Sequence, residues 1–500
     1  MKGNIRKASI YTIIGKFLSK ILGLIRERIT KTMFGLSPEM SIFSFVITLI
    51  GLIRSTTIKS INKVSVPHIL KHQEDEASIS SSFSVVILFN ILIGIILMIF
   101  SYPLAKYTLG NLTYSPSLIR FGQIMYIMAG TIIIILSISD TAESILSGFR
   151  IFTYQIIREP LINTIYIASI LIFPSTTMLM GGRLIGELVF AVIIAVALLI
   201  NKYFIWTKPH ISHIKTIIWL SIPVVLGTSI NFINTFVDRY MATLLPDTRS
   251  VSALAAATTI AILPYALFGE AIAKSVYTGF SEASTNKDMS EFSSYIGKVL
   301  YLGGWLIIPS AIGIASLSDN ITFFLYYGGK FQMNDVTLVS LATMFYAFRY
   351  LFTSLYIPLN NSLVALEKGY ISMWLALIFV PINIILNWLL GFQFHMGAPG
   401  FALATAITSG LMLISVIIIL LHITQSRLAR KHTYGLLKVT IASTIMALSL
   451  LFLKRLTGMS RIYTILLTVI GAMIYIVILG MLKDEELYHI IRKLARRKTQ

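Results

Sequence analysis

The sequence predicts an all-α polytopic membrane protein with about fourteen transmembrane helices. Of its 500 residues, 56% are hydrophobic and 12% are charged, and the mean hydropathy is +0.81. Soluble domains carry about a quarter charged residues, so this composition disfavours a soluble enzyme or a nucleic-acid-binding protein. Apolar stretches long enough to cross a ~30 Å hydrocarbon layer recur from end to end. Because two-residue alternation is absent, we expect helices rather than barrel strands.

The spans follow one another as two sets of six and a final pair. The first is expected to remain in the mature chain, because Lys16 and Lys20 interrupt its apolar run and no small-residue cleavage site follows. A polar linker separates the sixth span from the seventh. We expect the spans at 8–33, 41–63, 83–105, 119–146, 154–174, 181–202, 214–244, 252–280, 294–317, 337–362, 370–392, 399–423, 435–453 and 461–482.

The two sets of six spans predict two lobes. Six helices return the chain to the side on which it began, so the lobes would be parallel repeats about an axis along the membrane normal. The final, almost uncharged pair could pack against a lipid tail or complete the bundle. We expect an N-lobe at 1–202, a cytoplasmic linker at 203–213, a C-lobe at 214–425, the last two helices at 435–482 and a basic cytoplasmic tail at 483–500.

The basic residues indicate the orientation of the chain. It has 41 Lys and Arg against 21 Asp and Glu, a formal net charge of +20. With the N-terminus inside, roughly three quarters of the loop cations fall on the cytoplasmic side, which fits the positive-inside rule with both termini cytoplasmic. We interpret the tail from Lys483 to Lys498 as an orienting and lipid-surface segment, with no nucleic-acid partner. The outer loops would hold Lys106, Arg183, Arg249, Lys330, Lys454, Arg455 and Arg461.

Signatures of an enzyme are missing from the sequence. Without cysteine, the chain has no disulfide or thiolate metal site, and it contains no GxxxxGK[ST], HExxH or GxSxG motif. His210 and His213 lie in the linker, where a solvated loop is the simpler interpretation than a metal site. We therefore expect a transporter with no cofactor, driven by an ion gradient, by the membrane potential or by a partner.

Basic residues also lie inside the spans, where the positive-inside rule does not explain them. Each costs at least ~2.5 kcal/mol at mid-membrane, so a group of them needs an aqueous cavity, acidic partners or an anionic ligand. A positive cavity favours a phosphate or diphosphate, which Arg binds bidentately and Lys as a point charge. The span cations are Lys16, Lys20, Arg26, Arg28, Lys31, Arg54, Arg120, Arg158, Arg239, Lys274 and Arg349. The acids, fewer in number, are Glu27, Asp140, Glu143, Glu159, Glu187, Asp238 and Glu270.

A polar stripe along the first span predicts that one face borders an aqueous interior. At 100° per residue its members lie within about 60° of one another; they are Lys16, Lys20, Glu27 and Lys31. The alternative is a helix end whose cations reach the interface, which suits Arg28 and Lys31. Arg54 in the second span lies deeper, and Arg349 is ~20 Å into the tenth.

The other span charges have partners close by and are interpreted as structural. Glu270 and Lys274 have the i,i+4 spacing of a local ion pair. Asp238 and Arg239 are adjacent and can pair with other helices. At the end of the fourth span, the charges that can pair are Asp140, Glu143, Arg150, Arg158 and Glu159.

The first span contains Ser19-Lys-Ile-Leu-Gly-Leu-Ile-Arg-Glu-Arg-Ile-Thr-Lys-Thr-Met-Phe-Gly35, which resembles the first-helix signature of the MurJ (MviN) lipid II flippases. This family lies in the multidrug/oligosaccharidyl-lipid/polysaccharide exporter superfamily. Weaker matches follow in the right order at Leu52-Ile-Arg54 with Val66-Pro67, Asn234-Thr-Phe-Val-Asp-Arg239 with Ser250-Val-Ser-Ala-Leu254, and Tyr327-Gly-Gly-Lys-Phe331. The resemblance implies a V-shaped pair of six-helix lobes around a cationic cavity, and a groove for the polyprenyl tail at the last two helices.

The resemblance also implies a head-group site. Arg26 and Arg54 match cavity arginines of the family, and Lys20 stands where the family often has Arg; these three would contact the diphosphate and sugar. Two positions depart from the family, with Ser41 in place of an acid and Thr259 in place of an arginine, and Ile58–Lys63 replaces a Glu-Gly-Ala stretch. Further head-group candidates, some of which could supply the lost charge, are Lys16, Glu27, Arg239, Lys274 and Arg349.

A sodium site is attributed to relatives, among the seventh, eleventh and twelfth helices. The neutral candidates here are Asn231, Asn383, Asn387 and Thr405. A site without a carboxylate would bind a hard cation weakly, and the alternative interpretation is interhelical hydrogen bonding.

The function implied is a flippase that moves lipid II across a bacterial cytoplasmic membrane by alternating access, for cell-wall synthesis. Its partners would be lipid II or a similar polyprenyl-diphosphate glycolipid, membrane lipids and cell-wall synthases. Alternatives are a flippase for another polyprenyl-linked oligosaccharide, a drug/cation antiporter of the same superfamily, which needs an acidic cavity, and a non-transporting scaffold.

Overall fold

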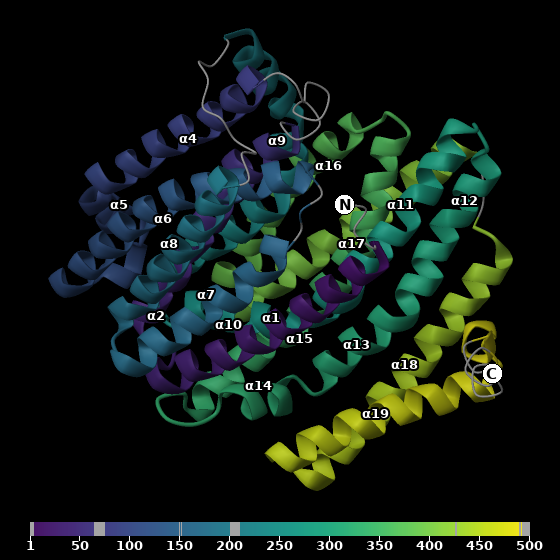
Figure 1. Ribbon diagram of the computed structural model, residues 1–500. Helices are drawn as coiled ribbons and strands as arrows, with labels where there is room; N and C mark the ends of the chain where they lie inside the picture. Colours follow the sequence, from purple (N-terminus) through teal and green to yellow (C-terminus); the bar gives the residue numbers. More distant parts are fainter. Residues whose placement is uncertain are drawn as a thin grey trace. The chain divides into compact units, whose positions relative to one another are not determined.

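The computed structural model describes residues 5–64, 76–149, 151, 153–200, 211–425, 428–489 and 492, and these are almost entirely helical (Figure 1). Each of the predicted spans lies on a helical segment, so the all-α polytopic fold is confirmed. Among the described residues, nine helices are long and apolar enough to cross a membrane by themselves. A tenth crossing results if Phe83–Ile99 and Ser101–Thr108, bent by 72°, count as one span.

The chain divides into two compact units. The first comprises Met1–Ser252 with Gly328–Phe331, and the second comprises Ala253–Tyr327 and Gln332–Gln500. The helix predicted to begin the C-lobe is α9 (Ile211–Thr243), and it belongs to the first unit. There it packs against α2 (Pro38–Ile53) and α4 (Glu76–Ile99). The lobe boundaries themselves, drawn at the 203–213 linker, stay a prediction.

The first unit is built around one long central helix, α6, on which α2, α4 and α8 pack. Its helices are α1 (Ile5–Phe34), α2 (Pro38–Ile53), the π-helical turn η1 (Arg54–Lys59), α4 (Glu76–Ile99), α5 (Ser101–Thr108), the 3-10 turn η2 (Gly110–Thr113), α6 (Pro116–Gly148), α7 (Thr153–Ile172), α8 (Thr176–Ile200) and α9 (Ile211–Thr243).

Local sequence sets where these helices begin and how closely they pack. Ser37 accepts a hydrogen bond from the Met40 amide at the start of α2, and Pro38 follows it, a combination that favours a helix N-terminus. Gly94 of α4 and Gly130 of α6 allow close contact of the two backbones. A Cβ added to Gly130 would lie 2.5 Å from the Gly94 carbonyl oxygen, so a larger residue would force the helices apart.

The second unit is organised by α15, which packs against α11, α13 and α17, while α18 packs on α13 and α19. Its elements are α10 (Ser250–Ala261), η3 (Tyr265–Gly269), α11 (Glu270–Thr285), α12 (Met289–Lys298), η4 (Val299–Gly303), α13 (Gly304–Ser316), α14 (Ser318–Tyr326), α15 (Met333–Ala365), α16 (Tyr370–Asn387), η5 (Trp388–Gln393), α17 (Gly397–Thr424), α18 (Arg430–Thr457) and α19 (Arg461–Met481). Three of these, η3, η4 and η5, are π-helical turns inside predicted spans.

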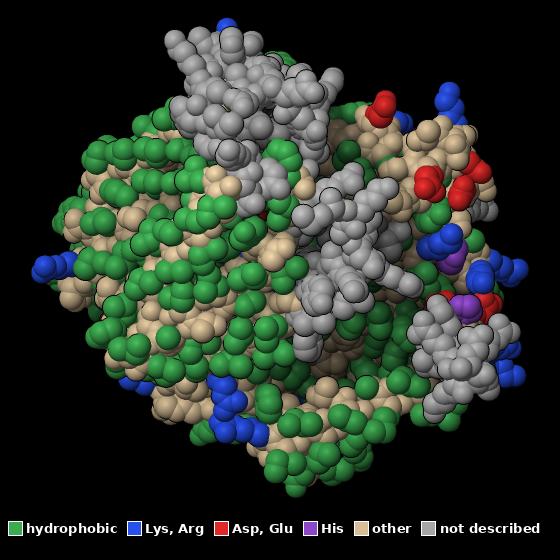
Figure 2. Space-filling model, in the orientation of Figure 1, with side chains coloured by type: hydrophobic (Ala, Val, Ile, Leu, Met, Phe, Trp, Pro, Cys, Tyr) green, Lys and Arg blue, Asp and Glu red, His purple; other side chains and the backbone are tan. Residues whose placement is uncertain are grey.

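The surface has the character that lipid contact requires. On the face drawn in Figure 2, hydrophobic side chains cover most of the area, and charged side chains stand at its margins. Many large apolar residues are exposed on single helices, among them Leu199 and Ile200 of α8 and Ile462 of α19. In water such surface would be costly, whereas in a bilayer it is the contact face.

Candidate functional site

Arg54 is held in the first unit by an acid from another helix. It opens the π-helical turn η1, where α2 ends, and its side chain is 15% exposed. Its Nε donates to Asp140 Oδ2 of α6 at 2.6 Å, and its Nη2 donates to Asp140 Oδ1 at 2.8 Å. This is the bidentate geometry in which Arg binds a carboxylate most strongly. π-helical turns are rare and concentrate at functional positions, and this one begins at the predicted cavity arginine.

Arg158 of α7 joins the acids of two neighbouring helices. It contacts Asp140, and its Nη1 lies 2.8 Å from Glu143 Oε2, while its Nη2 lies 3.0 Å from Glu187 Oε2 of α8. The Arg158 side chain is 4% exposed, and its guanidinium carbon lies 4.9 Å from the Phe190 ring centroid. Arg158 is therefore the centre of a charge cluster that connects η1, α6, α7 and α8.

We name this cluster the buried charge network. Arg183 of α8 adds a longer contact, 3.9 Å from Glu187 with i,i+4 spacing. Three arginines and three carboxylates balance, which is how charges are tolerated in a low-dielectric interior. Its members are Arg54, Asp140, Glu143, Arg158, Arg183 and Glu187. Among them, Arg183 was assigned from sequence to an outer loop; it lies instead within α8, as the spacing to Glu187 could have indicated.

Arg26 of α1 is positioned by α7 in a different way. Its Nη1 donates to Asn163 Oδ1 at 2.9 Å, and its guanidinium carbon lies 5.1 Å from the Tyr166 ring centroid. The adjacent Glu27 is 3.8 Å away, and the Arg26 side chain remains 29% exposed. An amide, an aromatic face and a distant carboxylate orient this guanidinium without saturating it, so it retains donors for an anion.

The residues of the polar stripe on α1 differ in their exposure to solvent. Lys20 is exposed and makes no ion pair within the described part of the chain. Lys31 is fully buried, 3.8 Å from Glu27, so the alternative of an end lysine that reaches the interface is wrong for this residue. At this end of α1 the neighbouring Thr32 carbonyl accepts a hydrogen bond from the Lys330 amide, which belongs to the same unit, so the helix end is covered. The Lys16 side chain lies outside the described residues.

The remaining head-group candidates are dispersed. Arg239 of α9 is buried and donates from Nη1 to the Val251 carbonyl at 2.8 Å, a contact that joins α9 to the start of α10. Arg349 of α15 is buried in the second unit, with its guanidinium carbon 5.2 Å and 5.3 Å from the Tyr346 and Tyr350 ring centroids. The Lys274 side chain lies outside the described residues. Thus Arg26, Arg54 and Lys20 share a unit, and Arg349 does not belong to it.

The candidate cation ligands of the second unit lie on α16 and α17, which pack together. Asn383 and Asn387 are fully buried one turn apart, and Asn387 Nδ2 donates to Asn383 Oδ1 at 3.4 Å. The Thr405 hydroxyl donates to the Phe401 carbonyl at 2.8 Å. The Asn231 side chain lies outside the described residues. Both interpretations, a weak cation site and structural hydrogen bonds, are compatible with these contacts.

Comparison with known proteins assigns the family. A family model described as "Lipid II flippase MurJ" matches residues 30–482. The probable lipid II flippase MurJ of Thermotoga maritima is 24% identical over 498 residues, 97% of this chain and 98% of that protein. The probable low-salt glycan biosynthesis flippase Agl15 of Haloferax volcanii is 26% identical over 211 residues, 42% of this chain and 42% of that protein.

Solved structures give the same fold. A lipid II flippase MurJ in an inward closed conformation matches with a TM-score of 0.79 at 23% identity, covering 95% of this chain and 98% of that one. An inward-facing multidrug resistance transporter of the MATE family matches with a TM-score of 0.70 at 12% identity, covering 83% of this chain and 98% of that one. Since the family model spans most of the sequence, this chain belongs to the lipid II flippase MurJ family.

Proposed function

We propose that this protein moves lipid II from the inner to the outer leaflet of a bacterial cytoplasmic membrane, with both of its termini cytoplasmic. Membership of the lipid II flippase family supports this substrate. The observation that carries the proposal is the state of Arg26, which is partly exposed and oriented by Asn163 and Tyr166. A pre-oriented guanidinium with free donors suits a diphosphate. Cell-wall synthases would consume the delivered precursor.

In this proposal the three cations of the first unit act in sequence. The exposed Lys20 and the partly exposed Arg26 make the first contacts with the diphosphate. Arg54 joins only if it exchanges Asp140 for phosphate, because both carboxylate oxygens of Asp140 now occupy its donors. Asp140 would keep a partner in Arg158, so the exchange leaves no carboxylate unpaired. Alternating access would then open the site to the outer leaflet while the tail stays in lipid.

A second candidate substrate is another polyprenyl-linked glycan. The relative from Haloferax volcanii, named as a glycan biosynthesis flippase, favours it. Both substrates carry a phosphate-linked polyprenyl chain, so the contacts of Arg26 and Arg54 do not distinguish them. The sugar or peptide beyond the phosphate would have to be recognised elsewhere.

The substrate is tested by depleting the protein in its own host and identifying the accumulated lipid-linked precursor by mass spectrometry. We expect lipid II to accumulate several-fold and peptidoglycan synthesis to stop, because the precursor remains in the inner leaflet. Accumulation of a different polyprenyl-linked glycan with normal lipid II would transfer the assignment to the second candidate. Unchanged levels of every lipid-linked precursor would contradict flippase activity of either kind.

In the same depletion strain, an Arg26→Ala variant is expected to restore little transport. A hydrogen bond to a charged group contributes about 1.5–3 kcal/mol, which corresponds to roughly a ten- to hundredfold loss. The matched control is Arg120→Ala, which removes the same side chain from an exposed position on α6. Growth on the variant equal to growth on this control, at equal membrane levels, would remove Arg26 from the site.

We also propose that Na⁺ or the membrane potential drives the cycle, with Asn383, Asn387 and Thr405 as candidate Na⁺ ligands. Thermal unfolding of the purified protein in 100 mM NaCl against choline chloride tests the site. We expect a higher midpoint in Na⁺, and a larger difference in Asn387→Asp because a carboxylate strengthens binding of a hard cation. Equal midpoints in both salts for both proteins would leave only the structural hydrogen bonds.

A further inference from the structure

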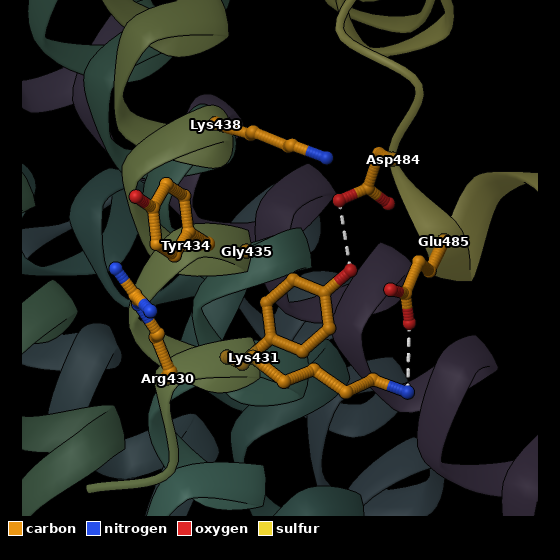
Figure 3. A pocket seen from close by; sticks show the side chains of 8 residues that line it. Arg430, Lys431, Tyr434, Gly435, Lys438, Asp484 and Glu485 are labelled. Atoms are coloured by element: carbon orange, nitrogen blue, oxygen red, sulfur yellow. Dashed lines mark hydrogen bonds and ion pairs between the residues drawn. The ribbon is translucent and has the colours of Figure 1, made fainter.

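A second polar site lies in the second unit, outside the network and far along the chain from it. The first turns of α18 and the segment after α19 enclose a cavity of about 300 Å³, lined by both charged and aromatic side chains (Figure 3). Arg430 and Tyr434 stand on the α18 side, and Asp484 and Glu485 face them (Figure 3). Lys438 extends from α18 across the cavity toward the C-terminal segment.

The two acids of this cavity are occupied by groups of the protein itself. Asp484 is fully buried and accepts hydrogen bonds from the Tyr301 hydroxyl at 2.8 Å, Trp305 Nε1 at 3.2 Å and the Leu487 amide at 3.1 Å. Glu485 pairs with Lys431 at 2.7 Å. These contacts satisfy carboxylate oxygens of both acids, and they engage one of the three cations, Lys431.

Two cations remain available to a ligand. The Arg430 guanidinium is exposed, 5.8 Å from the Tyr434 ring centroid, and Lys438 Nζ donates to the Lys483 carbonyl at 3.0 Å. Neither forms an ion pair with a carboxylate in the described part of the chain. Arg430 and Lys438 line the same cavity, and arginine and lysine are the side chains that bind phosphate, the first bidentately and the second as a point charge.

The helix that carries these cations continues as an apolar, exposed face. Leu437, Ile441, Ile445 and Leu448 are all exposed and lie within about 80° of one another on α18. The helix has 28 residues, about 42 Å at 1.5 Å per residue, which exceeds a ~30 Å hydrocarbon layer. Its first, basic turns therefore extend to the depth of the lipid head groups, directly beyond the face that contacts acyl chains.

We propose that this cavity binds the phosphate group of a membrane phospholipid, held by Arg430 and Lys438, with the acyl chains along the exposed face of α18. The continuity of the cationic cavity with the apolar face favours a lipid over free phosphate as the source. The bound lipid would fix the start of α18 to the C-terminal segment. Asp484 already joins this segment to η4 and α13, and Glu485 joins it to α18.

The test is native mass spectrometry of the delipidated full chain titrated with phosphatidylglycerol. The expected result is one retained lipid on the wild type and roughly tenfold weaker retention on Arg430→Gln and on Lys438→Gln, since each loses a charge-assisted hydrogen bond. The control is Arg455→Gln, which removes one charge at the opposite, exposed end of the same helix and should bind as wild type. All three positions are at the surface or half-buried, so we expect the variants to fold. Melting temperatures equal to that of the wild type check this.

Two further arms distinguish the sources of the phosphate. Diacylglycerol, which lacks phosphate, should not be retained, and inorganic phosphate at 10 mM should displace little phosphatidylglycerol. Displacement by inorganic phosphate at that concentration would overturn the lipid assignment in favour of a free phosphate site. Equal retention on wild type, both cavity variants and the control would overturn the site altogether.

Discussion

Replacing Arg158 by leucine is expected to abolish accumulation of the folded protein. The substitution leaves Asp140, Glu143 and Glu187 without their shared partner, and Asp140 and Glu187 are buried. Removing one member of a buried ion pair costs about 3–5 kcal/mol, because the remaining charge stays buried and uncompensated. A loss of this size is a large fraction of the stability of a typical domain, about 5–15 kcal/mol. Monodisperse protein recovered in detergent, and its melting temperature, measure the effect.

Two control variants show whether the effect of Arg158→Leu comes from the unbalanced charge or only from the loss of an arginine side chain. Arg183→Leu removes an arginine that is 22% exposed and lies 3.9 Å from its carboxylate, so we expect a much smaller loss. Arg158→Leu combined with Glu187→Gln removes one charge of each sign and should recover part of the yield. If Arg158→Leu alone melts with wild-type stability, the buried charge network does not stabilise the first unit.

The helices of this protein could be predicted from sequence because a single requirement dominates them. Each crossing needs about 20 apolar residues, and the linker at 203–213 interrupts the apolar pattern with Lys208, Pro209 and His210. The pairing of Arg158 with Asp140 and Glu143 was also predictable, since few other charges lie near that end of the fourth span. Hydropathy and charge pairing thus determine the elements and the partners that are close in sequence.

The partners that are distant in sequence were not predictable. Arg54 and Asp140 are separated by 86 positions, and their contact depends on how α2 and α6 rotate against each other. The π-helical turn that begins at Arg54 shifts that rotation by about one residue, which no hydropathy pattern reveals. Glu187 has Arg183 one helical turn before it, but its contact with Arg158 of α7 was likewise not predictable. A helical wheel gives the face of one helix and leaves open which helix will cover it.

A reversible disulfide between the end of α1 and the turn Gly328–Phe331 is expected to stop transport completely. The turn Gly328–Phe331 connects α14 to α15 in sequence, yet it belongs to the first unit, while the helices on both sides of it belong to the second. The Lys330 amide donates to the Thr32 carbonyl of α1 at 2.8 Å. In the orientation proposed above, with the N-terminus cytoplasmic, the end of α1 would lie at the outer surface, where alternating access requires an opening.

Glycine makes this contact possible. Gly329 has φ +57, and a Cβ at this position would lie 2.2 Å from the Thr32 carbonyl oxygen, which is backbone and cannot turn aside. Gly35, with φ +64, faces the Lys330 carbonyl oxygen in the same way, at 2.7 Å. The two glycines therefore allow two backbones to meet, and Gly329→Ala should weaken the contact.

A cysteine pair, Thr32→Cys with Lys330→Cys, converts the contact into a switch. The chain has no cysteine of its own, so within one molecule only this disulfide can form, and the two positions are joined by the backbone hydrogen bond between the Lys330 amide and the Thr32 carbonyl. We expect oxidation to abolish lipid flipping in vesicles and a reductant to restore it, because the outer end must separate once in each cycle. Each single-cysteine variant should flip normally under the same oxidant, and Gly329→Ala should lower the yield of the disulfide. Full flipping by the oxidised pair would mean that the head group leaves without any movement of this turn away from α1, and the outer opening would have to lie elsewhere.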